Sequence, residues 1–347
     1  MNEIIPIVMN DQLQKVALVE DYISLIWSSR YYATGDFELV VNVNDKYMNL
    51  FKQDYFIMRE DDENIGVIED ITIQRSEDGK NIMIIKGRFL ECLLARRIVA
   101  TQTTLAGAFS DCIYQLIDAN VINPLMPERQ ISNFLCGTDR FTDTVKAQYT
   151  GKNLLEVICE LCKTYSIGFK VTLNSNNQFV FQLYQGTDHS YNQSDNPWIV
   201  FSDEYDNLLS ATYEEDYQNI ATAVLVAGEG EGAARRTEWV TDGATGINRH
   251  EVYKDQRQIQ SNKGAIKASE YKRLLKEAGK EALTAYTTAF AGVVYFGEDT
   301  YRTKVQLGDI CVIKQDSWGI SINSRLVEVI ESVSETGEYS IVPSFGV

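Results

Sequence analysis

Apolar residues alternate with polar ones, or run in short blocks between polar turns, through most of the first hundred residues. A period of two is typical of strands that bury one face. The pattern predicts strands at Ile23 to Trp27, Phe37 to Val43, Tyr55 to Arg59, Gly66 to Arg75 and Asn81 to Arg88. Asp78-Gly79, between the last two, supplies the positive φ angles of a tight hairpin. Asn44 to Lys52 is predicted to form a short helical connection.

The period changes to that of a helix in two later segments, Thr104 to Ile117 and Asn153 to Tyr165. Their apolar stripes are Leu105, Phe109, Cys112, Ile113, Leu116 and Ile117, and Leu154, Leu155, Val157, Ile158, Leu161 and Cys162. Two strands, Phe169 to Leu173 and Phe179 to Tyr184, follow with turn residues between them. Residues 100–190 are therefore predicted to form a small α+β domain of two helices and a hairpin.

Strand patterns return in the final third, at Trp198 to Phe201, Leu208 to Glu214, Asn219 to Ala227, Gly308 to Lys314, Ser324 to Ser332 and Glu338 to Pro343. Ala265 to Phe290, rich in Ala, Glu, Lys and Leu, is predicted to be one long helix. Its apolar side either packs over the end of a barrel or contacts another subunit. The predicted domains are residues 1–99, a β-barrel; 100–190, the α+β domain; and 191–347, a second β-barrel region with a helical insertion at 265–290.

The first and last thirds resemble each other in layout. Segments at 54–60, 66–75 and 82–85 reappear in the same order at 309–315, 325–332 and 339–342, with an acidic turn containing Gly before the last segment in both. Antiparallel sheets remove their exposed edges by closing into barrels. We interpret the two regions as a pair of similar barrels, with chance repetition of common strand patterns as the alternative. The expected fold is mainly β, with two tube-type barrels flanking the α+β insertion.

Composition narrows the possible functions. The chain has 347 residues, 44% of them hydrophobic, which is typical of a globular protein and excludes a largely disordered one. Its 49 acidic and 32 basic residues give a net charge of −17, which disfavours a role in gripping a nucleic-acid backbone. The N-terminus lacks the basic start of a secretory signal, and the longest apolar run, Ala223 to Ala227, is too short to cross a bilayer. We expect a soluble protein whose six cysteines are reduced thiols.

One glycine-rich segment formally matches a dinucleotide-binding motif. Gly228-Glu-Gly-Glu-Gly-Ala233 fits GxGxxA after an apolar strand. The residues that follow lack a helical stripe, however, and the two glutamates in the loop would repel phosphate. A hairpin or a flexible loop is the favoured interpretation, and no cofactor is expected.

The other candidate motifs favour structural roles. Cys159 and Cys162 have CxxC spacing without a second ligand pair, so buried thiols are favoured over a metal site. His189 and His250 lie in polar contexts and are predicted to be solvated, and the acidic run Glu60 to Glu63 is predicted to be an exposed turn. No catalytic, cofactor-binding or metal-binding residue is therefore assigned. A pair of carboxylates of the glycosidase type has no sequence signature, so that possibility stays open.

Several short motifs resemble those of a known family. They are Asn219 to Gly232 followed by Arg235 and Arg236, the closing runs Leu307 to Val312, Arg325 to Val329 and Ile341 to Gly346, and the early Trp27-Ser-Ser-Arg30-Tyr31 with Gly35 to Leu39. This set is similar to the hub, or tail-tip base, proteins of tailed phages and of phage-derived injection particles. The resemblance spans most of the chain.

The resemblance implies a structural protein of the virion tail, assembled in the bacterial cytoplasm. Three chains with two barrels each would present six barrels, so a homotrimer would match a sixfold tail tube on one side and a threefold tail tip on the other. The implied partners are a tail tube or distal tail protein and a spike or fibre protein. DNA would pass without specific binding, and an acidic lumen would repel its phosphates.

Two other function classes remain as alternatives. A tail-associated enzyme that degrades cell wall or polysaccharide would need a catalytic constellation, and the hub-like regions leave little chain for one. A carbohydrate-binding module of the tail tip would bind glycans through exposed Trp or Tyr side chains. Because no such constellation is evident, we expect a non-enzymatic assembly protein.

Overall fold

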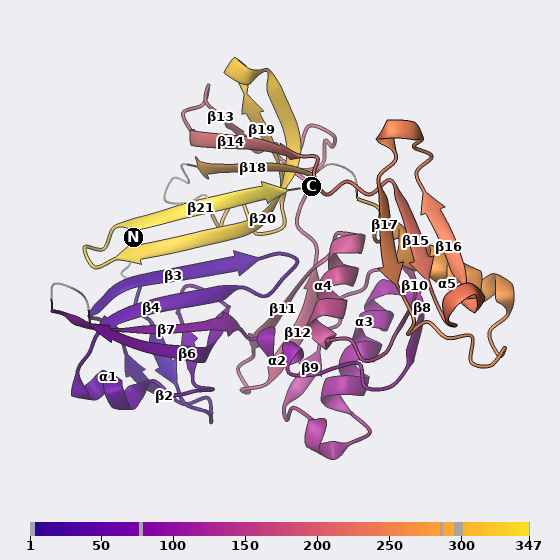
Figure 1. The fold of residues 1–347 in the computed structure, drawn as a ribbon. Helices are drawn as coiled ribbons and strands as arrows, with labels where there is room; N and C mark the ends of the chain where they lie inside the picture. The colour runs from indigo at the N-terminus through magenta and orange to yellow at the C-terminus, as the bar shows by residue number, and fades with distance from the viewer. Residues whose placement is uncertain (1–3, 76–78, 285–286, 295–300, 347) are drawn as a thin grey trace.

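The computed structural model describes residues 4–75, 79–284, 287–294 and 301–346. Strands from both ends of the chain share one large, mostly antiparallel sheet, in which only β13 and β19 pair in parallel among the described residues, and the indigo and yellow strands lie side by side in Figure 1. The N-terminal strands are β1 (Ile7–Met9), β2 (Lys15–Leu18), β3 (Tyr22–Arg30), β4 (Asp36–Asn42), β5 (Phe56–Met58), β6 (Ile65–Arg75) and β7 (Asn81–Phe89). The C-terminal strands are β13 (Val200–Ser202), β14 (Leu208–Asp216), β18 (Thr287–Val294), β19 (Ile310–Gln315), β20 (Ile320–Ser334) and β21 (Tyr339–Gly346).

The two halves of this sheet join where β20 pairs with β3. The pairing is antiparallel and runs from Glu328 opposite Arg30 to Ser334 opposite Ser24. Within the described residues, the strand path runs from β14 at one end to β2 at the other, and no ladder returns to close either half. The mainly β character predicted from the sequence is confirmed, whereas the structure shows one continuous sheet instead of two separately closed ones.

The halves repeat a five-strand arrangement. In spatial order, β5-β6-β7-β4-β3 matches β19-β20-β21-β18-β14, with every neighbouring pair antiparallel. The ladders also share their irregularities. The register shifts between Tyr22 and Ser24 in β3 and between Leu208 and Ser210 in β14, and again between Ile68 and Asp70 in β6 and between Leu326 and Glu328 in β20. Because a bulge is a specific local feature, two matched bulges support duplication of one unit.

The middle of the chain forms a separate α+β layer. It contains α2 (Cys92–Ala95), β8 (Thr103–Ala108), α3 (Phe109–Ile117), a π-helical turn (Asp118–Ile122), a 3-10 turn (Pro127–Arg129), β9 (Phe134–Cys136), β10 (Thr144–Tyr149), α4 (Leu154–Tyr165), β11 (Gly168–Leu173) and β12 (Phe179–Tyr184). The apolar stripes of α3 and α4 lie in one buried core. The Asn153 side chain caps α4 by accepting the Leu155 and Glu156 backbone N–H groups.

A third, smaller part lies between β14 and β18 in the chain. Its sheet has the order β16 (Thr237–Thr241), β15 (Ala223–Ala227), β17 (Glu251–Asp255), and α5 (Ala268–Lys280) covers one face. The remaining described elements are α1 (Asp45–Leu50) and 3-10 turns at Gly232–Ala234, Gly246–Asn248 and Asp316–Trp318. None of the described helices is long and apolar enough to span a membrane.

Several sequence predictions are confirmed. The strands of residues 23–88 and 308–343, the helix α1 and the helix α4 occur where their patterns place them. The β6–β7 hairpin is confirmed by the pairing of Arg75 with Asn81, although turn residues 76–78 lie outside the described residues.

Two predicted helices are wrong in extent. The helix expected over 265–290 ends at Lys280, and Thr287–Val294 is strand β18, paired with β14 and β21. The β-branched residues of that segment favour a strand once two partners are available, and this tertiary pairing overrides the helical tendency of the Ala-rich sequence. Leu105, placed on a helical face, lies instead on strand β8, which pairs with β10.

Candidate assembly site

The junction between β3 and β20 is built on a buried tryptophan. Period-two alternation turns Leu25 and Trp27 of β3 toward the same core as Val333 of β20. The Trp27 ring is fully buried and lies 4.7 Å from the Phe89 ring, measured between centroids. This apolar layer fixes which face of the shared sheet is buried.

An ionic network lies directly beside Trp27. The Arg59 guanidinium lies over the Trp27 ring, 5.5 Å from its centroid, and donates to a Glu331 carboxylate oxygen at 3.2 Å. Arg302 donates to the other Glu331 oxygen at 2.5 Å and also pairs with Asp62. Arg59 and Glu331 are each 1% exposed. The network joins the turn after β5, strand β20 and the segment that precedes β19.

The charges of this network are nearly balanced by their neighbours. Burial alone would lower the pKa of Arg59, but the Asp61 and Glu331 carboxylates raise it above its usual value. Burial raises the pKa of Asp62. Among the described residues, the Nη1 atom of Arg59 has no hydrogen-bond partner. Since an unpaired buried charge is costly, loss of one member is expected to disrupt the junction.

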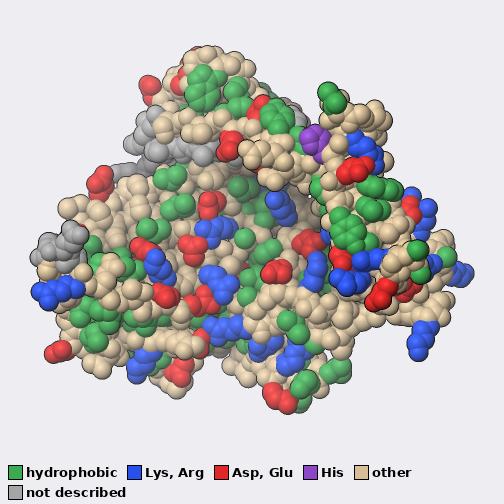
Figure 2. Space-filling model, in the orientation of Figure 1, with side chains coloured by type: hydrophobic (Ala, Val, Ile, Leu, Met, Phe, Trp, Pro, Cys, Tyr) green, Lys and Arg blue, Asp and Glu red, His purple; other side chains and the backbone are tan. Residues whose placement is uncertain are grey.

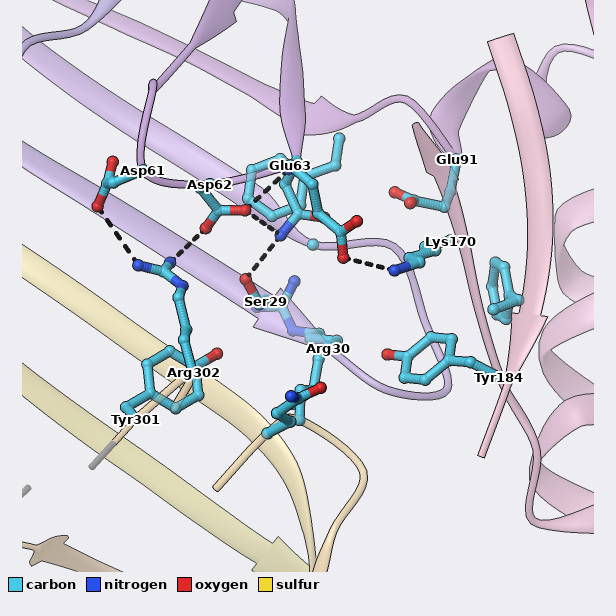
Figure 3. A pocket seen from close by; sticks show the side chains of 16 residues that line it. Ser29, Arg30, Asp61, Asp62, Glu63, Glu91, Lys170, Tyr184, Tyr301 and Arg302 are labelled. Atoms are coloured by element: carbon cyan, nitrogen blue, oxygen red, sulfur yellow. Dashed lines mark hydrogen bonds and ion pairs between the residues drawn. The ribbon is translucent and has the colours of Figure 1, made fainter. Parts of the chain in front are cut away.

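A pocket of about 330 Å³ opens next to the network, between the two halves of the sheet and the α+β layer (Figure 3). Glu63 and Lys170 form an ion pair across it at 2.5 Å, and Asp61 and Asp62 both pair with Arg302. Protein cations already pair with these carboxylates. The pocket is therefore suited to a structural role, in which its ion pairs hold three segments of the chain together.

Glu91 is a buried acid of this pocket. Its carboxylate accepts the Val171 backbone N–H at 2.8 Å and the Thr34 hydroxyl at 3.2 Å. Burial nevertheless raises the pKa of Glu91 to about 7. A protonated Glu91 is therefore favoured in the folded protein under mildly acidic conditions.

The exposed face of the large sheet carries paired charges. Ion pairs cross its strands between Arg30 and both Asp36 and Glu328, between Lys86 and Glu38, and between Arg88 and Glu69. Figure 2 shows acidic and basic side chains interleaved over these strands. This face therefore has mixed, locally compensated charge, in contrast to the acidic surface that the net charge of −17 suggests.

Two strands of the duplicated units, β6 and β14, offer edges for pairing. Along its outer edge, β6 pairs with β5 only from Ile65 to Val67, and within the described residues no ladder covers Ile71 to Arg75 on that edge. Among the described residues, β14 forms a ladder with β18 alone, so its other edge has no strand partner. Ile71 and Ile73, on one face of β6, are 37% and 50% exposed. Exposed apolar strand edges are sites where another chain can add a strand.

Several motifs singled out in the sequence lie at this junction, among them Trp27 to Tyr31, Arg325 to Val329 and the acidic run Glu60 to Glu63. Gly228 to Ala233 connects β15 to β16 in a hairpin, as predicted. Cys162 is buried on α4 and Cys159 is half-buried, so the buried-thiol prediction holds fully for Cys162. No group of three or more potential ligands within the described ranges is placed to hold a metal ion.

One prediction about charged groups is wrong, and a second holds only in part. The wrong prediction is that of a solvated His189, because this side chain is 13% exposed and its Nε2 lies 3.6 Å from an Asp309 carboxylate oxygen. In the acidic run, Glu60, Asp61 and Glu63 are exposed, as predicted, whereas the Asp62 side chain is 4% exposed and accepts a hydrogen bond from Trp27 Nε1 at 3.1 Å. Arg302, the cation that pairs with Asp62, lies 240 residues away in the sequence, so no local pattern predicts this pair.

Comparisons with known proteins identify the family. The family model described as "Siphovirus ReqiPepy6 Gp37-like protein" matches residues 5–347. No curated protein matches the chain.

Solved structures of tail proteins, two of them from prophages, share its fold. A tail protein from Neisseria meningitidis MC58 superimposes with a TM-score of 0.60 at 13% identity, covering 99% of this chain and 97% of that one. The prophage MuSo2 43 kDa tail protein from Shewanella oneidensis gives 0.57 at 12% identity, with 99% and 98% covered. The prophage tail protein gp18 from Listeria monocytogenes EGD-e gives 0.53 at 13% identity, with 99% and 94% covered. The chain therefore belongs to the Siphovirus ReqiPepy6 Gp37-like family, and it shares its fold with these tail proteins.

Proposed function

We propose that the protein is a non-enzymatic hub of the tail tip, which forms a trimeric ring between a sixfold tail tube and a threefold spike or fibre base. The repeated five-strand unit is the observation that carries the proposal. A trimer of a chain with two similar units presents six of them in a ring. Identical copies can then meet sixfold and threefold neighbours at once.

The charge pattern of the large sheet suits a ring through which DNA passes. Phosphate binding needs cations that are free to displace counterions. On the exposed face of β3, β4 and β7, the basic groups Arg30, Lys86 and Arg88 are each paired with a carboxylate. If this face lines the lumen, DNA meets a surface with little net attraction.

The proposed partners are a tail tube or distal tail protein on the sixfold side and a spike or fibre protein on the threefold side. The proposed ring units are the β regions within residues 1–99 and 191–347, and residues 100–190 form the α+β domain outside them. Both units come from one chain, so the ring needs no second protein to complete it.

Mass measurement tests the proposal. Native mass spectrometry of purified protein at high concentration, and of isolated tail tips, is expected to give a species of three chains. A dimer or a hexamer as the assembled form in tail tips would overturn it. A substrate-degrading role has a separate test, since lysis of peptidoglycan by the purified protein would contradict a purely structural function.

A further inference from the structure

The pairing of β20 with β3 provides an internal template for a contact between copies. β20 uses one edge twice: residues 320–325 pair with β19, and residues 328–334 pair with β3 of the other unit. β6 is the equivalent of β20, and its edge pairs with β5 over residues 65–67. The rest of that edge is the part that has no ladder in the described residues.

The matched bulges fix which residues correspond. Aligning the bulge of β6 with that of β20 makes Asp70 equivalent to Glu328 and Gln74 equivalent to Ser332. Aligning the bulge of β14 with that of β3 makes Asp216 equivalent to Arg30 and Thr212 equivalent to Ile26. Ser332 lies opposite Ile26 at the internal junction.

We propose that β6 of one copy pairs antiparallel with β14 of a second copy, in the register of the internal β20–β3 ladder. In this register Gln74 lies opposite Thr212 of the neighbouring copy, and Ile71 lies opposite its Glu215. The inference rests on the proposed ring, and it names the surface that holds the ring together.

The exposed isoleucines of β6 support this assignment. Ile71 is equivalent to Val329, which is fully buried beside β3, and Ile73 is equivalent to Glu331, which is 1% exposed. The same positions are thus buried where the ladder is formed and exposed where it is not. A second copy on this edge would cover both isoleucines.

The contact is head-to-tail, because β6 and β14 are different surfaces of the chain. A heterologous contact gives a closed ring when the rotation between copies closes, and an open filament when it does not. The internal junction already relates two similar units within the chain. If the contact between copies repeats the same step, six steps complete the ring in three chains.

The end of the proposed ladder differs from its template. Asp70 of one copy faces Asp216 of the next, where the template has the ion pair of Glu328 and Arg30 at 2.6 Å. Like charges that face each other weaken a strand pair. We therefore expect the contact between copies to be weaker than the internal one.

Cross-linking tests the pairing. A variant with Gln74→Cys and Thr212→Cys, treated with a short thiol-specific cross-linker as concentrated protein and in tail tips, is expected to give covalent species that stop at three chains. The matched control is Asp70→Cys with Thr212→Cys, whose thiols would lie about 13 Å further out of register. It is expected to give at least tenfold less cross-linked product.

The outcomes separate this inference from the proposed function. Cross-linked species that run past three chains support the strand pairing and contradict the closed ring. A three-chain mass with equal cross-linking of the two variants, or with none, contradicts the pairing and leaves the ring intact. Absence of association in tail tips contradicts both.

A second variant tests the contact without thiols. Ile71→Lys with Ile73→Lys changes exposed positions, so folding of the single chain should be unaffected while trimer formation falls at least tenfold. Val16→Lys with Leu18→Lys on β2 is the control, because these residues are similarly exposed, at 47% and 48%. Trimer formation by the β6 variant at the level of the unaltered chain would overturn the proposal.

Discussion

Substitution of Glu331 tests how the two halves of the sheet are held together. Glu331 is 1% exposed and accepts hydrogen bonds from Arg59 at 3.2 Å, Arg302 at 2.5 Å and the Tyr339 hydroxyl at 2.5 Å. In Glu331→Ala, Arg302 keeps Asp62, which leaves Arg59 as the least compensated group. Its remaining carboxylate is Asp61, whose side chain is 46% exposed.

The expected loss follows from the burial of these groups. Removing one partner of a buried ion pair costs about 3–5 kcal/mol, because the other charge stays buried without compensation. Since Arg59 retains one carboxylate, we expect Glu331→Ala to lower the free energy of unfolding by about 3 kcal/mol. Glu331→Gln keeps an acceptor for Tyr339 and should cost about half as much.

Equilibrium unfolding in urea, followed by tryptophan fluorescence and circular dichroism, measures the effect. Glu60→Ala is the control, because Glu60 lies 3.5 Å from Lys15 on the surface and is 77% exposed. An exposed ion pair of this kind contributes less than about 1 kcal/mol. A loss below about 1 kcal/mol for Glu331→Ala would refute the view that this network fastens the junction.

Three further substitutions test the interior. Burial raises the Glu91 pKa to about 7, so the protonated acid stabilises the fold fully below about pH 4.5. This stabilisation is lost as the pH rises toward 7. The unfolding free energy of wild type relative to Glu91→Gln should therefore fall by about 3 kcal/mol between these two pH values. Gly87→Ala should cost at least about 3 kcal/mol, because a Cβ there would lie 1.7 Å from the Val67 carbonyl oxygen. Tyr149→Phe should change stability by less than about 1 kcal/mol, because within the described residues the buried Tyr149 hydroxyl has no hydrogen-bond partner.

Each of these predictions has a clear contrary result. A pH-independent difference between wild type and Glu91→Gln in urea titrations would show that Glu91 ionises normally. Gly107→Ala is the control for Gly87→Ala, because a Cβ at Gly107 meets no atom within 4 Å, and equal losses for the two would refute the steric reasoning. A loss above about 2 kcal/mol for Tyr149→Phe would mean that its hydroxyl has a partner in solution.

The strands and helices with strong local periodicity could be predicted from the sequence. Helix α4 has an Asn cap and a complete apolar stripe, and the β6–β7 hairpin has an Asp-Gly turn beside alternating residues. The repeated layout of the two β regions was also visible, because β5 to β7 and β19 to β21 keep the same order and spacing. Local sequence patterns are thus sufficient to predict these elements and part of their arrangement.

The junction itself has almost no local signal. Arg59 and Glu331 meet across 272 residues of sequence, and the paired residues of β3 and β20 are at least 298 residues apart. One clue was present, since Glu331 lies between Val329 and Val333 at an inward-facing position of the strand pattern. A lone acid at such a position indicates a buried partner, but its sequence spacing cannot identify which cation provides it.

Strand β18 shows a different difficulty, an ambiguous local preference for helix or strand. Its sequence follows α5 with no strong terminator, and Ala and Thr residues fit either a helix or a strand. Pairing with β14 and β21 decides the outcome. This pairing completes the second five-strand unit, which a continuous helix over 265–290 would have removed.

The symmetry of the assembled tail tip tests the central claim most directly. A three-dimensional reconstruction of tail tips, made without imposed symmetry, should show a ring of three copies in which six similar β units surround the lumen. A ring of six copies, or a single copy at the tip, would contradict the proposal that one duplicated chain adapts sixfold to threefold order.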